Sequence, residues 1–208
     1  MQYSLGIGVL GITETLLMEP ESKKYNQIMV KMYETVSYFI EDVESSDRLT
    51  IVKDSQFNRR QYVRSLCAFI EATIWQYKQC CLKLTKLVNM PSLTTIEKAF
   101  LDDEEVKLND KGDFSTSRIN IPLSRNLLAT ANVLNKMLHT TIEPKSDNAG
   151  WESFVKLNRV RNTLMHPKSK ADFEVDDDAM KYARTTFMWL VKEFHKKVFD
   201  SSVEIKSK

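Results

Sequence analysis

The sequence contains few of the residues that build disulfide frameworks, metal clusters or dinucleotide-binding loops. Its 208 residues include three cysteines, three histidines and five glycines. Cys67, Cys80 and Cys81 all fall within one predicted helix and have no C-x-x-C or Cys/His ligand spacing, so neither a disulfide framework nor a metal site is indicated. We therefore expect no metal or other cofactor. The odd number of thiols, with no recognisable signal peptide, favours a reducing cytoplasm.

A strong charge excess and a long apolar run are missing as well. The formal net charge of +2 gives no global basic field, so any affinity for nucleic acid must come from a local cluster. The apolar run at residues 5–12 is far shorter than the roughly 20 residues that cross a bilayer. We therefore expect no membrane partner.

The same run contains Gly6, Gly8 and Gly11 in a formal G-x-G-x-x-G pattern. A dinucleotide fingerprint needs a strand before the glycines and a βαβ unit around them. Only five residues precede Gly6, and a helix is predicted after Pro20. We interpret residues 1–20 as an amino-terminal segment without nucleotide-binding function.

The rest of the chain is predicted to be helical. Apolar residues recur at helical spacing in residues 22–43, 56–89, 123–141, 151–166 and 176–197. Ser45, Ser46 and Asp47 predict the end of the first helix, and Pro91 predicts the end of the second.

The connections are predicted to be short. Thr94 and Glu97 fit the capping box of a short helix. Residues 102–114 are mostly acidic and predict a loop insertion, and residues 144–150 predict a linker. We expect an all-α fold, an elaborated helical bundle that forms a single domain over residues 21–200, with a flexible tail at residues 201–208.

The most informative stretch is RNTLMHP at residues 161–167. On a helix, Arg161 projects into the middle of an apolar arc, which is formed by Phe154, Leu157, Val160 and Leu164. An unpaired charge there would be costly to bury. Arg161 therefore either meets an acidic side chain from another helix or faces a solvent-filled site.

Polar residues line the edge of this arc. Asn158, Asn162 and His166 follow one another at four-residue steps, and Pro167 predicts the end of the helix. A histidine at the carboxyl end of a helix suits acid–base chemistry near neutral pH. The alternative is a structural pair or a helix cap.

Glu71 is the candidate partner of Arg161. It flanks the core stripe of the long helix together with Arg60, Arg64 and Lys78. A carboxylate there can hold the guanidinium group through a bidentate contact. The alternative is an exposed ion pair of Glu71 with Arg64 or Lys78.

A basic run surrounds the same stretch. No acidic residue occurs between residues 156 and 170, which include Lys156, Arg159, Arg161, Lys168 and Lys170. Such a run is either solvated surface or a contact for the phosphates of a nucleic acid.

Two further groups of side chains are given structural roles. His139 and His195 lie near predicted helix ends without an acid or a cysteine at ligand spacing, so we interpret both as surface or capping residues. The last helix carries apolar side chains that we place mostly in the core, with any excess available to a dimer interface: Phe187, Met188, Trp189 and Phe194.

The spacing from Arg161 to His166, with Asn162 after the arginine and WESF at residues 151–154 before it, resembles the R-x4-H signature of the HEPN superfamily. These all-α proteins include many metal-independent endoribonucleases, in which both protomers of a homodimer form one RNA-cleaving cleft. The resemblance implies such a dimer and suits a toxin or phage-defence effector, with an antitoxin or regulator as a further partner. Lys168 stands where one subgroup has a tyrosine that its antitoxin modifies, so that kind of antitoxin is not expected.

Two main functions follow from these residues. The first is cleavage of single-stranded RNA through attack of the ribose 2′-hydroxyl on the adjacent phosphate, which DNA cannot undergo. His166 would move the proton, Arg161 would stabilise the charge on the phosphate, and Asn162 would hold the phosphate or the imidazole. The second is a non-catalytic HEPN-like module that binds RNA, a nucleotide or a protein. A purely structural helical interaction protein is a third reading.

Overall fold

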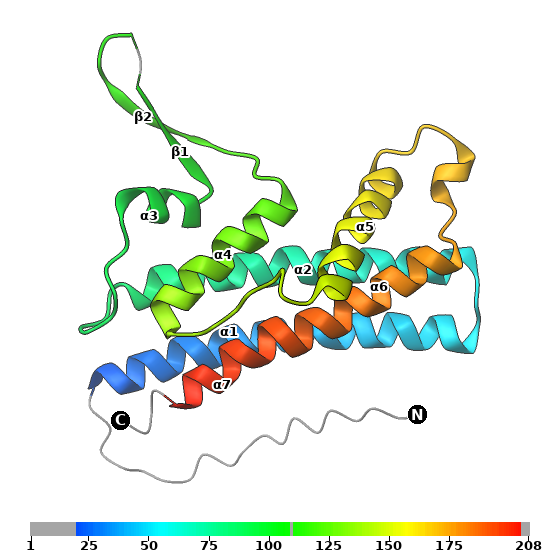
Figure 1. Cartoon of the computed structure of the whole chain (residues 1–208), viewed down its shortest axis with the longest axis horizontal. Helices are drawn as coiled ribbons and strands as arrows, with labels where there is room; N and C mark the ends of the chain where they lie inside the picture. Colours follow the sequence, from blue (N-terminus) through cyan, green and yellow to red (C-terminus); the bar gives the residue numbers. More distant parts are fainter. Residues whose placement is uncertain (1–19, 109, 205–208) are drawn as a thin grey trace.

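The computed structural model describes residues 20–108 and 110–204 (Figure 1). The glycine pattern at residues 6–11 lies outside the described residues. The elements follow in the order α1 (Pro20–Val52), α2 (Gln56–Leu84), α3 (Thr95–Leu101), β1 (Glu104–Leu108), β2 (Phe114–Arg118), α4 (Leu123–Leu138), α5 (Asn148–Met165), α6 (Asp177–Trp189) and α7 (Lys196–Glu204). A 3-10 turn (Lys170–Phe173) precedes α6, and a π-helical turn (Leu190–His195) joins α6 to α7. The predicted all-α bundle is confirmed.

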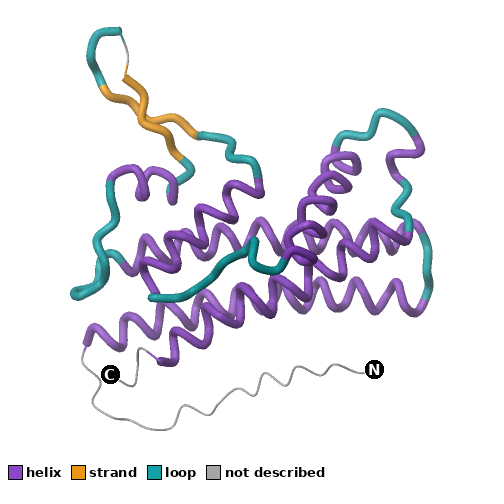
Figure 2. Tube along the Cα trace, in the orientation of Figure 1, coloured by secondary structure: helices purple, strands orange, loops and turns teal. Residues whose placement is uncertain are grey.

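The long helices form the body of the bundle. α1 and α2 run antiparallel and pack along each other, and the rod formed by α6 and α7 lies along them (Figures 1 and 2). α4 packs on α2, and α5 packs on α6. Side chains such as Val36, Leu66, Phe154 and Ala183 are completely buried between these helices. Burial of large apolar side chains of this kind, at about 1.5 to 3 kcal/mol each, is what holds the helices together. Within the described residues, no helix combines the length and apolarity needed to cross a membrane.

The first helix is longer than the sequence pattern predicts. α1 continues through Ser45, Ser46 and Asp47 to Val52, so the end predicted there is wrong. The hydroxyl groups of Ser46 and Ser65 of α2 form a hydrogen bond of 2.9 Å, and Asp47 pairs with Arg184 at 2.9 Å. Because neighbouring helices satisfy these polar residues, they do not need to break the helix.

Other helix ends also differ from the predicted ones. α2 stops at Leu84, five residues before the predicted end. α4 stops at Leu138, where exposed His139 takes a left-handed conformation with φ of 53° and forms the cap, as predicted. α5 begins at Asn148, inside the predicted linker, because the side chain of Asp147 accepts a hydrogen bond of 3.1 Å from the backbone N–H of Gly150.

The acidic insertion is a β-hairpin and not the predicted loop. β1 and β2 pair antiparallel, with Glu104 opposite Arg118 and Leu108 opposite Phe114. The predicted capping box of Thr94 and Glu97 is present at the start of α3, which precedes the hairpin. The hairpin projects from the bundle on the same side as the carboxyl end of α5 (Figure 1).

A buried lysine anchors the base of this hairpin to α2. Lys78 is fully buried, and its Nζ donates to the backbone carbonyl of Phe100 at 2.9 Å and pairs with the carboxylate of Asp103. The same Nζ lies 4.1 Å from the centre of the Phe100 ring. These contacts offset the cost of burying the charge.

The carboxyl-terminal helices correct one prediction and bear out another. Residues 201–204, predicted as the start of a flexible tail, continue α7. Trp189 and Phe194 are buried and Phe187 packs against the core, as predicted, whereas 53% of Met188 is exposed. Asp176 caps α6 by accepting a hydrogen bond of 2.7 Å from the backbone N–H of Ala179.

His195 is not the surface or capping residue that the sequence suggests. The helical rod continues past it to Glu204, so His195 is not at a helix end, and the π-helical turn places it against the core. Its Nδ1 forms a hydrogen bond of 2.8 Å with the hydroxyl group of Tyr77, which is fully buried. Burial lowers the pKa of His195 from 6.5 to about 4, because a charged imidazole loses its hydration there.

Stability is therefore expected to fall as the pH is lowered from about 6.5 toward 4. In that window the unfolded chain binds a proton at His195 and the folded chain does not, so protons favour unfolding. The stability that uncharged His195 contributes is therefore fully present above pH 6.5. Urea unfolding midpoints of the wild type and of His195→Gln, measured across this range, would check it. The wild type should lose more stability than the variant, and parallel losses would contradict the assignment.

Candidate functional site

Glu71 of α2 and Arg161 of α5 meet where the two helices approach each other. Nη2 of Arg161 donates to Oε1 of Glu71 at 2.5 Å. The sequence predicts a bidentate contact, and the structure has a contact through one guanidinium nitrogen. Of the alternative partners, Lys78 is paired with Asp103, and Arg64 lines the same hollow as the ion pair.

Asn162 holds the guanidinium group from a second direction. Nη1 of Arg161 donates to Oδ1 of Asn162 at 3.1 Å. The side chain of Arg161 is 31% exposed and that of Glu71 is 46% exposed. Arg161 is thus fixed by two hydrogen bonds and is still reachable from solvent, which is the arrangement that an anion-binding arginine requires.

A hollow of about 560 Å³ opens beside this ion pair. Its polar side chains are Arg64, Glu71 and Arg161, and its apolar ones are Val63, Cys67, Ala68, Leu164 and Met165. Burial raises the pKa of the Cys67 thiol to about 12, although nearby Arg161 acts in the opposite direction. Cys67 is therefore a neutral thiol at physiological pH and lacks the thiolate that a cysteine nucleophile needs.

His166 ends α5, as Pro167 predicts. Its backbone leaves the helical conformation, with φ of −130°, and its N–H donates to the carbonyl oxygen of Asn162 at 3.1 Å. The residue is exposed. It follows Asn162 by about one helical turn and lies outside the residues that line the hollow. The structure therefore brings Arg161, Asn162 and Glu71 together and places His166 beyond them at the helix end.

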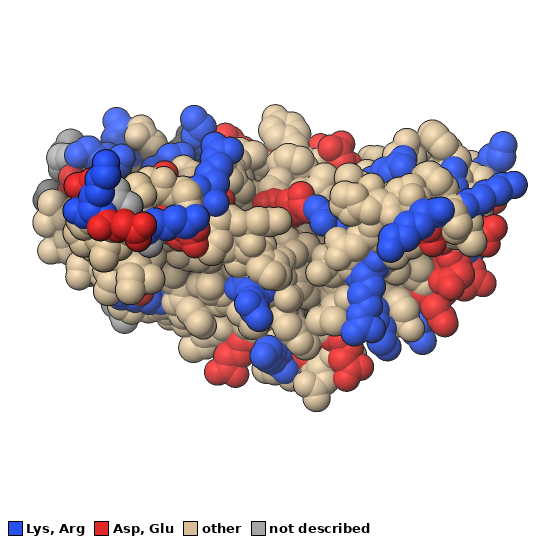
Figure 3. All heavy atoms as spheres, turned by 90° about the horizontal axis from the view of Figure 1, so that it is seen from above, with Lys and Arg blue, Asp and Glu red and all other residues tan. Residues whose placement is uncertain are grey.

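The predicted basic residues are exposed around this end of α5. Lys156 and Arg159 lie on the solvent-facing side of the helix, and Lys168 and Lys170 lie in the segment that follows it. The Nζ of Lys156 is 4.7 Å from the centre of the Tyr182 ring. Viewed from above, the molecule carries basic side chains, with acidic ones among them, toward both ends of this face, and an acidic and a basic side chain lie side by side near its middle (Figure 3).

Local hydrogen bonds order the segment that carries Lys168 and Lys170. The carboxylate of Asp172 accepts from the backbone N–H groups of Lys168 at 2.7 Å and Ser169 at 2.8 Å. These two bonds hold the pKa of Asp172 below its ordinary value. An acidic residue thus follows the basic run directly, and its charge is used to shape the turn.

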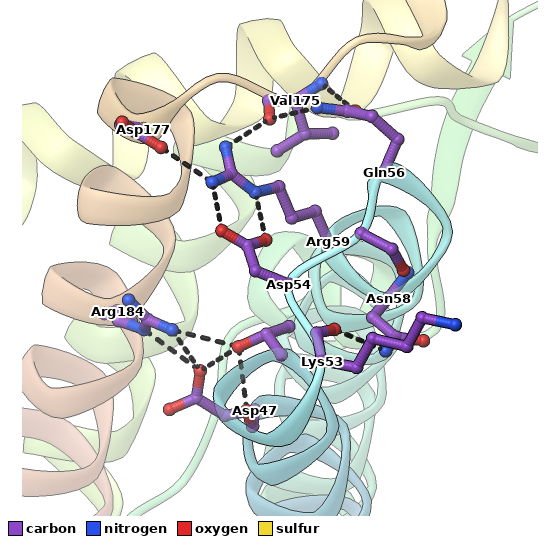
Figure 4. Close-up of polar contacts among 11 residues, drawn as sticks. Asp47, Lys53, Asp54, Gln56, Asn58, Arg59, Val175, Asp177 and Arg184 are labelled. Carbon is purple, nitrogen blue, oxygen red and sulfur yellow. Dashed lines mark hydrogen bonds and ion pairs between the residues drawn. The ribbon is translucent and has the colours of Figure 1, made fainter.

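A polar clamp fixes the far end of the same segment to the bundle (Figure 4). Arg59, at the start of α2, donates to both carboxylate oxygens of Asp54 at 2.6 and 2.5 Å and lies 2.7 Å from Asp177. It also donates to the backbone carbonyl of Val175 at 3.0 Å. The chain between α5 and α6 is therefore tied down at its far end as well as by its own turn.

Sequence reasoning missed part of the site. It named Glu71 and Arg64 on α2, but the exposed face of that helix also carries Ala68 and Trp75. These positions are three or four residues apart and therefore share one face. That spacing is readable in the sequence, yet nothing there shows that α5 lies beside this face. Met165 was missed for the same reason.

Comparison with protein-family models, with curated proteins and with solved structures finds no match to this chain. The likeness to HEPN proteins therefore rests on the residues from Arg161 to His166 themselves.

Proposed function

We propose that the protein is a metal-independent endoribonuclease of the HEPN type that cleaves single-stranded RNA. The observation that supports this most is the partly exposed Arg161, held by Glu71 and Asn162 beside an open hollow. An arginine that only links two helices has no need of this access. An arginine that must bind a phosphate does.

The proposed reaction is an internal transfer at phosphorus. The 2′-oxygen loses its proton and bonds to the adjacent phosphorus, while the bond to the 5′-oxygen of the next nucleotide breaks and that oxygen gains a proton. The products are a 2′,3′-cyclic phosphate and a 5′-hydroxyl group. Arg161 stabilises the negative charge that builds on the phosphoryl oxygens, His166 moves a proton, and Asn162 helps to hold the phosphate. Glu71 is a positioning residue that orients Arg161.

This chemistry also supports a homodimer. The attack requires a base and the leaving oxygen requires an acid, whereas one chain supplies a single histidine at this site. Two copies that bring their α5 ends together would supply two. His166 lies outside the hollow of its own chain. In the proposed dimer, His166 of one copy faces the phosphate that Arg161 of the other copy binds.

The second candidate is a non-catalytic module that binds single-stranded RNA with the same residues. The position of His166 outside the residues that line the hollow favours this alternative. In that case Arg161 and the neighbouring lysines hold the phosphates and no proton is transferred. The two candidates differ in whether bound RNA is cut.

The proposal is tested by incubating the purified full chain with single-stranded RNA in the presence of a chelator. We expect fragments that carry 2′,3′-cyclic phosphate and 5′-hydroxyl ends, identified by mass spectrometry. DNA of the same sequence should stay intact because it lacks the nucleophile. Loss of cleavage in the chelator, or equal cleavage of DNA, would refute this mechanism. Binding without cleavage would favour the second candidate.

Lys168 and Lys170 are expected to contact the RNA backbone. Replacing both with alanine should weaken binding to all sequences and lower the slope of log affinity against log salt by about 1.4, since each of the two phosphate contacts on a single strand contributes about 0.7. Lys23→Ala with Lys31→Ala, two exposed lysines of α1, is the matched control. The same affinity and slope in both double variants would assign Lys168 and Lys170 to ordinary surface.

A further inference from the structure

The exposed face of α2 extends beyond the ion pair. Arg64, Ala68, Glu71 and Trp75 occupy positions three or four residues apart, and all four are exposed. The first three line the hollow with Arg161. Trp75 follows Glu71 by one turn, about 6 Å along the helix, so a ligand that leaves the hollow along α2 meets its ring next.

Trp75 differs from the other tryptophans of the chain. Trp189 is only 4% exposed, and Trp151 packs against it with 6.3 Å between the ring centres. Trp75, in contrast, is 52% exposed. An exposed indole keeps a large apolar surface in water, and Trp75 is not among the described side chains that form the hydrophobic core or pack against it as partly buried residues.

The hollow, which ends about one helical turn before Trp75, fits one kind of ligand. Arg64 and Arg161 offer positive charge at the hollow, and Ala68, Leu164 and Met165 offer apolar surface. A single-stranded nucleic acid needs both, because its phosphates are negative and its unstacked bases have apolar faces. The bases of a duplex are already stacked and cannot use such a surface.

We infer that Trp75 is the stacking platform for a nucleobase of single-stranded RNA whose backbone is held at Arg161. This inference rests on the proposed function and extends it by assigning a base-binding residue to the same site. Trp75 tolerates any base, since every base has a π-face. It therefore raises affinity and requires an unpaired substrate without selecting a sequence.

The test uses a 2′-O-methyl RNA oligonucleotide, which lacks the free 2′-hydroxyl group and so cannot be cleaved by this chemistry. Binding is followed by fluorescence anisotropy of the labelled oligonucleotide and by the protein's tryptophan emission. We expect the oligonucleotide to quench the wild-type emission. Trp75→Ala should weaken binding about tenfold, whereas Trp75→Phe should keep most of the affinity and lose the quenching. Tyr38→Ala, which removes an aromatic side chain of α1 that is 69% exposed, should change neither signal.

The outcomes separate this inference from the proposed function. Cleavage of ordinary RNA by the wild type, with unchanged binding in Trp75→Ala, would overturn the inference and leave the nuclease standing. Binding that depends on Trp75, without any cleavage of ordinary RNA, would support the inference and contradict the nuclease. A wild type that does not bind the oligonucleotide, or quenching that persists in Trp75→Phe, would overturn the inference.

Discussion

Replacement of His166 by alanine is expected to lower the rate of RNA cleavage by a factor on the order of a hundred or more, as is typical when a general acid or base is removed. His166 is exposed at the end of α5, so the variant should fold normally. Single-turnover cleavage rates and thermal unfolding of both proteins would measure the two effects separately. A folded and fully active variant would end the assignment of His166.

Arg161→Ala is expected to cause a loss of similar size, because the group that stabilises charge on the phosphate is removed. The effect on folding should be small. The carboxylate of Glu71 is 46% exposed, so water can solvate it after the arginine is lost, and exposed pairs are worth about 1 kcal/mol or less. If Arg161 were purely structural, the variant would instead lose a few kcal/mol of stability. Arg125→Ala, at an exposed position of α4, controls for the loss of one positive charge.

Mixtures of these two inactive variants test the composite site. If the proton-transfer group and the phosphate-binding arginine of one site come from different chains, heterodimers can combine an intact arginine with an intact histidine. Mixing Arg161→Ala with His166→Ala should then restore part of the activity. Activity equal to the sum of the separate variants would contradict a site that needs only one arginine and one histidine, each from a different chain.

Gly150→Ala is expected to destabilise the protein by about 2 kcal/mol. A Cβ atom at this position would lie 2.3 Å from both Cγ and Cδ1 of the Trp189 ring. The ring is held in the core, so either the indole or α5 must shift, at a cost of about 1 to 3 kcal/mol that the better helix propensity of alanine offsets only in part. Denaturant unfolding at constant pH would measure the loss.

A neighbouring substitution separates this clash from a general effect on the helix. Asn148→Ala changes an exposed residue in the first turn of α5 and should alter stability by no more than about 0.5 kcal/mol. If Gly150→Ala were as stable as the wild type, the close approach of α5 to α6 would be in doubt. The position of Arg161, which depends on that approach, would then be in doubt as well.

Gly150 also shows what the sequence could and could not predict. Apolar periodicity located every long helix, because a buried face at 3.6-residue spacing is a local property. The extent of α1 beyond Asp47 depends on partners distant in the sequence, Ser65 and Arg184. The start of α5 before Gly150 follows from the local cap by Asp147, whereas the close approach of Gly150 to Trp189 is visible only in the structure.

The candidate site, too, could be predicted from the sequence only in part. The polar edge of α5 was readable because Asn158, Asn162 and His166 follow one another at four-residue steps. Glu71 could be named as a candidate partner of Arg161. The sequence could not exclude an ion pair of Glu71 with Lys78, because it does not show that Lys78 pairs with Asp103. Trp75 could not be connected with Arg161, because only the packing of α5 beside α2 brings the two faces together.

The most direct test of the central claim uses a DNA oligonucleotide that contains a single ribonucleotide. The only 2′-hydroxyl group in such a substrate marks the only bond that the proposed reaction can break. We expect the wild type, in the presence of a chelator, to cut on the 3′ side of that ribonucleotide and leave a 2′,3′-cyclic phosphate, and we expect His166→Ala to cut it slower by a factor on the order of a hundred or more. Cleavage at the deoxyribonucleotides, or equal cleavage by His166→Ala, would contradict the account.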